Sequence, residues 1–284
     1  MAVVMMVSGG VDSFLASALH EDAIHVFVDY GQEYASMERR AVERFWPNYK
    51  HVTVSGLPDP GPGYYVPARN LMLATIGSRF GDPVCLAGMR DEMCEDKNPK
   101  AFEEMSSLLT AHSKRPVRVF SPFWGHTKSE AVLSYLQAGG DCSLLLQTVS
   151  CYGSGDTPCL DCEACFRRFV ALRSNGLDVQ RPSDSVVRAY GLHRIHSVPL
   201  ATAHSTLLAL HMSGTPVVGV SVEDVVANPD AVSPKGSLRI VYTSRRTVGP
   251  DLIGRTLSQS NVRFDAVLTG VPDGFFSFHD GLLS

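Results

Sequence analysis

The chain has 284 residues, of which 44% are hydrophobic and 19% are charged, and its formal net charge is −4. This composition is typical of a globular protein that buries a large core without disulfide bonds, and the length suits two domains. The acidic balance gives no electrostatic reason to expect direct binding to nucleic acid. No run approaches the roughly 18 apolar residues of a membrane span, and Met1–Val7 lacks the basic flank of a signal peptide. We therefore expect a cytoplasmic protein without membrane contact.

The first half of the chain alternates segments typical of strands and of helices. Short apolar runs predict strands, and segments with helical spacing lie between them. The expected strands are Val3–Val7, Ala23–Val28, His51–Val54, Pro83–Ala87 and Val117–Phe120, and the expected helices are Val11–His20, Ala35–Phe45, Asn70–Phe80, Pro99–Thr110 and Lys128–Gln137. The Pro- and Gly-rich segment Leu57–Tyr65 is typical of a loop. This order predicts an α/β fold with a doubly wound parallel sheet, which binds ligands at the carboxyl ends of its strands.

Turn-forming residues at Asn175–Asp184 indicate a linker. We therefore predict two domains, residues 1–178 and residues 191–284, the second being a small α/β domain. Its expected elements are strands at Pro216–Val220 and Leu238–Tyr242 and a helix at Gly249–Ser260, followed by a last apolar run at Ala266–Leu268.

A loop suited to phosphate follows the first expected strand. It has the sequence Ser8-Gly9-Gly10-Val11-Asp12-Ser13. The two glycines allow a tight turn, the amides of Gly10, Val11 and Asp12 would point at an anion from a helix N-terminus, and two serine hydroxyls add donors. The alternative is a plain strand-to-helix turn in which Asp12 or Ser13 is the N-cap. The whole hexapeptide directly after an apolar strand favours phosphate binding.

Ser-Gly-Gly-x-Asp-Ser resembles the PP-loop of N-type ATP pyrophosphatases, which cleave ATP between its α and β phosphates and leave AMP on the substrate. The loop is not a Walker motif, because no Gly-Lys-Ser/Thr follows. The resemblance implies that the chain uses ATP with magnesium, and it places Asp12 at the magnesium–pyrophosphate end.

Four of the seven cysteines crowd into residues 151–165. They are Cys151, Cys159, Cys162 and Cys165. Four thiolates in a compact loop fit one tetrahedral zinc ion, and a complete set of sulfur ligands makes that zinc structural. An iron–sulfur cluster is the competing interpretation, because it also uses four cysteines. A redox Cys-x-x-Cys pair is a further alternative, although two cysteines would suffice for it.

The motifs between Val3 and Leu172 together resemble the 7-cyano-7-deazaguanine synthase family. Besides the PP-loop and the cysteine spacing, they include Asp29-Tyr30-Gly31-Gln32, Val66-Pro67-Ala68-Arg69-Asn70, Pro122, Lys128, Glu130 and Arg168. The resemblance implies a PP-loop fold of the adenine nucleotide α-hydrolase type. It also implies that 7-carboxy-7-deazaguanine and ammonia give 7-cyano-7-deazaguanine through an acyl-adenylate and an amide, with ATP, magnesium and one structural zinc.

The resemblance further implies roles for single residues. The expected catalytic residues are Asp12, Ser13, Lys128 and Arg69. The expected nucleotide contacts are Ser8, Gly9, Gly10, Val11, Asp12, Ser13 and Asp29. The candidates for substrate binding are Tyr30, Gln32 and Asn70. The alternatives are a turn residue for Asp29, surface cations for Arg69 and Lys128, a helix cap for Asn70, and a brace of the zinc loop for Arg168.

Two segments depart from the family pattern. Glu33-Tyr34 replaces an Arg-His pair, and residues 94–102 replace a segment with Tyr-Pro-Asp-Cys-Arg, so that Lys97 or Lys100 would take the place of its arginine. This second segment lies where the substrate is recognised. The remaining alternatives are therefore a related enzyme that stops at the amide, one that acts on another carboxylate or a tRNA base, and a nucleotide-binding protein without catalysis. The expected partners are the small-molecule substrate and ammonia, with a homodimer as one option.

The C-terminal segment lies outside this resemblance. Val217–Ser221 and the following Glu223 weakly resemble the first motif of haloacid dehalogenase-type phosphatases, and Ile240–Arg245 resembles their second. Ser221 stands where the nucleophilic carboxylate belongs, so we expect no phosphatase activity. The alternative is an unrelated small α/β domain.

Overall fold

The computed structural model describes residues 2–57, 66–192, 198, 200–213, 278–279 and 282–283. The chain divides into two compact units, Met1–Arg168 and Phe169–Ser284, and the division falls within helix α7 (Glu163–Arg173). The domain boundary expected at residue 178 stays a prediction. All strands and the helix expected between residues 216 and 268 lie outside the described residues. So do Ser221, Glu223 and most of the loop Leu57–Tyr65.

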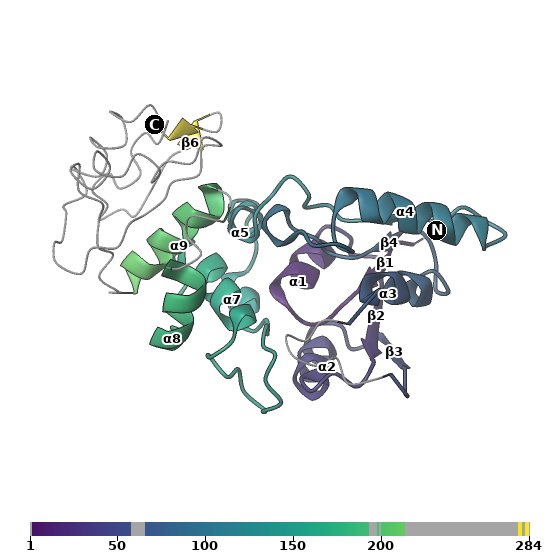
Figure 1. Cartoon of the computed structure of the whole chain (residues 1–284), viewed down its shortest axis with the longest axis horizontal. Helices are drawn as coiled ribbons and strands as arrows, with labels where there is room; N and C mark the ends of the chain where they lie inside the picture. The colour runs from purple at the N-terminus through teal and green to yellow at the C-terminus, as the bar shows by residue number, and fades with distance from the viewer. Residues whose placement is uncertain are drawn as a thin grey trace. The chain divides into compact units, whose positions relative to one another are not determined.

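A parallel sheet of five strands forms the centre of the first unit (Figure 1). The strands are β1 (Val4–Met6), β2 (Ile24–Asp29), β3 (Lys50–Thr53), β4 (Val84–Cys85) and β5 (Val119–Phe120). Their order is β3-β2-β1-β4-β5, and Val4 of β1 is in register with Ile24 of β2 and Val84 of β4. The chain adds strands first on one side of β1 and then on the other, which creates a switch point at the carboxyl end of β1. The predicted doubly wound sheet is confirmed.

Helices follow the strands of the sheet in the predicted order. They are α1 (Val11–Ala18), α2 (Ala35–Phe45), α3 (Arg69–Gly77), α4 (Pro99–Ala111), α5 (Lys128–Gln137) and α6 (Cys142–Leu146). Helices α2 and α5 begin and end at the expected residues. Helix α5 starts sharply because Thr127 and Glu130 form a reciprocal capping box, in which each side chain accepts the other's backbone N–H. The short α6 was not predicted.

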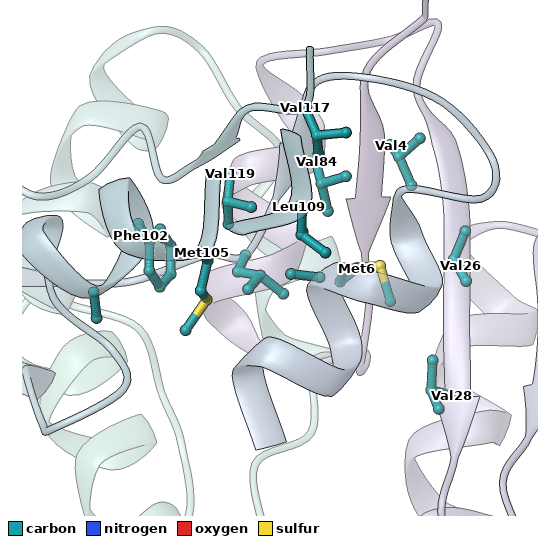
Figure 2. Close-up of a cluster of buried hydrophobic side chains, with 13 residues drawn as sticks. Val4, Met6, Val26, Val28, Val84, Phe102, Met105, Leu109, Val117 and Val119 are labelled. Carbon is teal, nitrogen blue, oxygen red and sulfur yellow. The ribbon is translucent and has the colours of Figure 1, made fainter. Parts of the chain in front are cut away.

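One face of the sheet packs against α3 and α4. The buried cluster on this face contains Val4, Met6, Val26, Val28, Val84, Leu86, Val117 and Val119 from the sheet and Ala74, Ala101, Phe102, Met105 and Leu109 from the helices (Figure 2). The strand residues of this cluster alternate in sequence, so Met5, Phe27 and Cys85 point to the opposite face. This alternation buries the central strands β1 and β4 on both faces, as expected for parallel strands, whereas the edge strand β3 is mostly exposed.

The other face carries α1, α2 and α5. The ring of Phe14 in α1 lies 5.0 Å from that of Phe45 in α2 and 5.6 Å from that of Tyr135 in α5. These aromatic contacts fix α1 between its two neighbours. The loop from β1 into α1, which carries the PP-loop sequence, is thereby held in place at the switch point.

The described part of the second unit is mostly helical. It contains the end of α7, α8 (Asp184–Val186), a π-helical turn (Val187–Leu192), α9 (Leu200–Met212), and two paired antiparallel strands, β6 (Phe278–His279) and β7 (Leu282–Leu283). Helix α9 was not predicted. Among the described residues, no helix is both long enough and apolar enough to cross a lipid bilayer.

Candidate active site and cysteine cluster

The PP-loop sequence lines a cavity of about 230 Å³. Gly9 has a φ of +71°, and a Cβ there would lie 2.4 Å from Cβ of Ala41, so this position requires glycine. Gly10 is the N-cap of α1 and no side chain caps the helix. The alternative in which Asp12 or Ser13 is the N-cap is therefore wrong. The first amides of α1 are left for an anion.

Ser13 stabilises the loop from inside. Its hydroxyl donates to the Gly10 carbonyl at 3.1 Å and accepts the Ser8 N–H at 3.3 Å. The two ends of the loop are thereby tied together before any ligand binds. Such preorganisation lowers the entropy lost when a phosphate is bound.

Five charged side chains gather in the cavity beside this loop. They are Asp12 of α1, Glu92 after β4, Lys97 before α4, Lys128 of α5 and Arg167 of α7. The Lys128 ammonium lies 3.1 Å from a carboxylate oxygen of Asp12 and 2.7 Å from one of Glu92. The Lys97 ammonium lies 3.3 Å from Glu92 and 4.0 Å from Asp12, and Arg167 approaches Glu92 to 3.5 Å.

Burial and mutual charge set the protonation of this cluster. Burial and repulsion by Glu92 raise the pKa of Asp12 to about 6, although Lys128 and Lys97 act in the opposite direction. Burial also acts to raise the pKa of Glu92, but Lys128, Lys97 and Arg167 outweigh it and hold that pKa well below its usual range. Burial acts to lower the pKa of Lys128, and attraction to the two carboxylates outweighs it. The three cations thus compensate Asp12 and Glu92, and Arg167 also lies 3.8 Å from the Glu163 carboxylate.

A second polar group, at the end of β2 and the start of α2, lines the same cavity. The Gln32 side chain donates to Oε2 of Glu38 at 3.0 Å and to the Val28 carbonyl at 3.3 Å, and its oxygen accepts the Tyr30 N–H at 2.9 Å. Burial raises the pKa of Glu38 to about 7, even though Gln32 and Arg69 act to lower it. The fixed amide of Gln32 thus positions a carboxyl group whose charge is poorly stabilised.

Aromatic side chains surround Arg69 in this part of the cavity. Burial acts to lower the pKa of Arg69, but its interactions with Tyr30, Tyr34 and Tyr152 outweigh burial and raise it. The hydroxyls of Tyr30 and Tyr34 lie 3.3 Å apart, and the rings of Tyr34 and Tyr152 have centroids 5.6 Å apart. A permanently charged guanidinium beside tyrosine rings can bind a carboxylate or stack on a planar ligand.

The structure brings most of the predicted site residues together. Those that line the cavity are Ser8, Gly10, Val11, Asp12, Ser13, Tyr30, Gln32, Arg69, Asn70 and Lys128. Asp29 and Gly9 are not among the lining residues. The Asp29 carboxylate accepts the Gly31 N–H at 3.0 Å, which is the turn role considered as its alternative.

The remaining candidates include residues that line the cavity and one that lies on the surface. Asn70 donates to the Asp96 carboxylate from its backbone at 3.1 Å and from its side chain at 2.9 Å, and the N-cap of its helix is Ala68. Lys97 lines the cavity, whereas the Lys100 side chain is 85% exposed and pairs with Glu104. Of the two candidates for the missing arginine, only Lys97 is therefore placed at the site.

Two further residues of the predicted pattern have supporting positions. Glu130 caps α5 and pairs with Arg90 at 2.9 Å, which fixes the helix start that carries Lys128. Arg168 donates to the Leu146 carbonyl at 2.8 Å and to the Thr148 hydroxyl at 3.3 Å. It thus braces the segment that leads into the cysteine loop, as considered from the sequence.

Among the residues that line the cavity, sequence reasoning missed the polar side chains of Glu38, Glu92, Tyr152 and Arg167. Glu92 follows β4 by a few residues, and acidic side chains near the carboxyl end of a strand are a recognisable signal in this fold. The other three come from α2, the cysteine loop and α7. Only the tertiary packing shows that they reach the cavity.

The four predicted metal ligands form one cluster, with all four Sγ atoms within 4.8 Å of one another. Tetrahedral zinc with bonds of about 2.3 Å would place sulfur atoms about 3.8 Å apart, and the Sγ atoms of Cys159 and Cys165 are 4.0 Å apart. The amides of Gly153 and Cys159 both donate to the Cys151 sulfur at 3.2 Å, which fixes the position of this sulfur. The cluster therefore fits a zinc ion.

The cysteine loop also reaches the cavity, because Ser150, Cys151 and Tyr152 line it. The Arg167 guanidinium donates to the Tyr152 hydroxyl at 3.1 Å. The cysteine loop thus contributes both to the charged cluster beside the PP-loop and to the polar group around Arg69. The parallel sheet, the PP-loop at its switch point and the adjacent four-cysteine loop define an α/β protein of the PP-loop type.

Comparison with known proteins agrees with this class. Residues 52–176 match the family model described as "Queuosine biosynthesis protein QueC". The chain is 29% identical over 219 residues to the 7-cyano-7-deazaguanine synthase of Methanothermobacter thermautotrophicus, an alignment that covers 63% of this chain and 97% of that protein. It is 27% identical over 217 residues to the enzyme of the same name from Persephonella marina, with 62% and 94% covered. Over these residues the chain is thus similar to the QueC family and to enzymes named 7-cyano-7-deazaguanine synthase.

Proposed function

We propose that the protein converts 7-carboxy-7-deazaguanine and ammonia into 7-cyano-7-deazaguanine, at the expense of ATP. The observation that carries this proposal is the uncapped PP-loop helix facing the cations Lys128, Lys97 and Arg167 across one cavity. Such an arrangement suits a reaction in which pyrophosphate leaves, because the developing charge meets fixed donors. The relatives named above support the choice of substrate.

The proposed chemistry has two activations. A carboxylate oxygen of the substrate attacks the α-phosphorus of ATP, the bond to the bridging oxygen breaks, and pyrophosphate leaves. Ammonia then attacks the acyl carbon and AMP leaves, which gives the amide. The amide oxygen is adenylated in the same way, and loss of AMP and protons leaves the nitrile.

The chain's own residues have distinct tasks in this scheme. The amides of the PP-loop and the hydroxyls of Ser8 and Ser13 hold phosphate oxygens. Lys128 and Lys97 neutralise the departing pyrophosphate, and Asp12 would hold the magnesium ion, which would supply further positive charge there. Arg69 orients the carboxylate of the substrate. Zinc in the cysteine cluster would supply a structural cross-link.

Residues 191–284 contribute no catalytic group to this scheme. In our proposal the catalytic domain is residues 1–178, and the C-terminal domain serves structure or contacts with partners.

The proposal is tested by incubating the purified chain with ATP, magnesium, ammonium and 7-carboxy-7-deazaguanine and analysing the products by mass spectrometry. We expect AMP, pyrophosphate and the nitrile, all dependent on the deazaguanine. Accumulation of the amide as the end product would show that the chain catalyses only the first activation and the amide formation. ADP and phosphate as the main products would contradict the mechanism.

A pair of matched variants tests the role of the loop. Asp12→Ala is expected to lower turnover by on the order of a hundredfold or more. Asp22→Ala is the control, because Asp22 is an exposed aspartate just beyond the same helix. Equal turnover of both variants would refute the assignment of Asp12.

A further inference from the structure

Glu38 is a carboxyl group in the cavity that the proposed chemistry does not use. It lies in the first turn of α2 and lines the cavity together with Tyr34 and Arg69. Within the part of the chain that the structure describes, Gln32 is the one hydrogen-bond donor to this carboxylate, and it binds Oε2. A carboxylate has about four acceptor positions, so most of its capacity is unused.

The surroundings of Glu38 stabilise its charged form poorly, because few donors replace the water lost on burial. Burial raises the pKa of this carboxyl group to about 7, although Gln32 and Arg69 act to lower it. A partly desolvated carboxylate is stabilised when further N–H groups donate to it. The cavity therefore favours a ligand that brings donors to this point.

We propose that Glu38 recognises the heterocycle of the substrate by accepting hydrogen bonds from two adjacent N–H groups on one edge of the ring. This inference rests on the proposed function, because a 2-aminopyrimidin-4-one ring carries such an edge in its ring N–H and its exocyclic amine. The two donors are parallel, as in a guanidinium group, and match the two oxygens of a carboxylate. An adenine-like edge offers one donor and one acceptor and does not match.

Two neighbouring features support this assignment. Gln32 is itself fixed by the Val28 carbonyl and the Tyr30 N–H, so the oxygen it binds on Glu38 is held in one position. The tyrosine rings of Tyr34 and Tyr152 lie beside the same part of the cavity and offer surfaces for a planar ring. Glu38 thus becomes a specificity residue, and Gln32 becomes its positioning residue.

The experiment measures binding without turnover. Isothermal titration calorimetry compares 7-deazaguanine with 7-deazahypoxanthine, which lacks the exocyclic amine, in the absence of ATP. For the wild-type chain we expect a preference of about 10–100-fold for 7-deazaguanine, the range for a good bidentate pair. Glu38→Gln should reduce this preference to about threefold or less, because an amide places one donor against the donors of the ring.

Glu43→Gln is the matched control. Glu43 lies on the same helix, but its side chain is 53% exposed and pairs with Arg39. It should retain the full preference, and zinc content should be equal in all three proteins.

Every outcome bears on the proposal. A wild-type chain that does not distinguish the two probes overturns it, whether or not Glu38→Gln folds. A Glu38→Gln protein that folds and keeps the wild-type preference also overturns it. Failure of the proposed function would give a different result. The chain would still prefer 7-deazaguanine to 7-deazahypoxanthine but would form no AMP from 7-carboxy-7-deazaguanine.

Discussion

Replacing Lys128 tests whether the ionic cluster is held together by this buried cation. Its side chain is only 9% exposed and lies within 2.7 Å of Glu92 and 3.1 Å of Asp12. At an effective dielectric constant of about 20, each attraction amounts to roughly 5–6 kcal/mol before the cost of desolvation is subtracted. Removing one partner of a buried ion pair costs about 3–5 kcal/mol in measured cases. Lys97 and Arg167 continue to compensate Glu92, so we expect Lys128→Met to lower the free energy of unfolding by about 3 kcal/mol.

The pH dependence of this loss follows from Asp12. Its pKa is raised from 3.8 to about 6 in the folded chain. For an acid with a raised folded-state pKa, ionisation disfavours folding, so its contribution is most favourable below about pH 4 and declines as the pH rises through about 6. Without Lys128 the pKa of Asp12 rises further. The difference in the free energy of unfolding between the wild-type chain and Lys128→Met should therefore grow between pH 5 and pH 8.

Urea unfolding followed by tryptophan fluorescence measures the free energy of unfolding of the structural unit that contains Lys128. The chain has two tryptophans, Trp46 and Trp124, and both lie in the unit Met1–Arg168. Lys100→Met is the control, because Lys100 is exposed and pairs with a neighbour on its own helix. Equal effects of the two substitutions, or a deficit that does not change with pH, would refute the reasoning.

Two further predictions concern the metal and the core. The purified chain should hold about one zinc ion, and Cys162→Ser should lower both zinc content and melting temperature, since metal binding and folding are linked. Cys142→Ser, which affects an exposed cysteine outside the cluster, should change neither, and iron with a visible absorption band would contradict the assignment. Phe102→Ala should lower the free energy of unfolding by about 3–4 kcal/mol, because the side chain is 2% exposed and packs against Trp124. Leu108→Ala on the same helix, at a side chain that is 44% exposed, should cost less than about 1 kcal/mol, and similar losses in chemical denaturation would contradict this reasoning.

The fold of the first unit could be predicted because local signals agree with tertiary structure. Helix α5 begins at Lys128 because the preceding Thr127 and the later Glu130 form a capping box, which is visible in the sequence. The strand Val4–Met6 is buried on both faces and therefore appears as a continuous apolar run. Helices α6 and α7 escaped prediction because they flank the cysteine loop, whose turns and metal ligands conceal the periodicity.

The candidate site was only partly predictable. The PP-loop is a contiguous motif, so its residues could be found together, and the cysteine spacing likewise indicated one cluster. Glu92 and its partners Lys97 and Arg167 come from three separate segments, and no local pattern shows that they meet in one cavity. Asp29 follows β2 and its carboxylate holds the turn at Gly31, so the nucleotide contact expected of it stays a prediction.

Two consecutive residues of helix α2 contact different parts of the protein, the cysteine cluster and the cavity. Met37 is buried against the cysteine cluster with Cys151 and Cys165, and the next residue, Glu38, lines the cavity. Arg40, two residues after Glu38, pairs at 2.9 Å with Asp156 in the cysteine loop. A metal held by the cysteines would therefore set the rotation of this helix turn, and with it the direction of the Glu38 carboxylate. If Glu38 has the role proposed above, chains that lack the metal would lose selectivity for the ring of the ligand as well as stability.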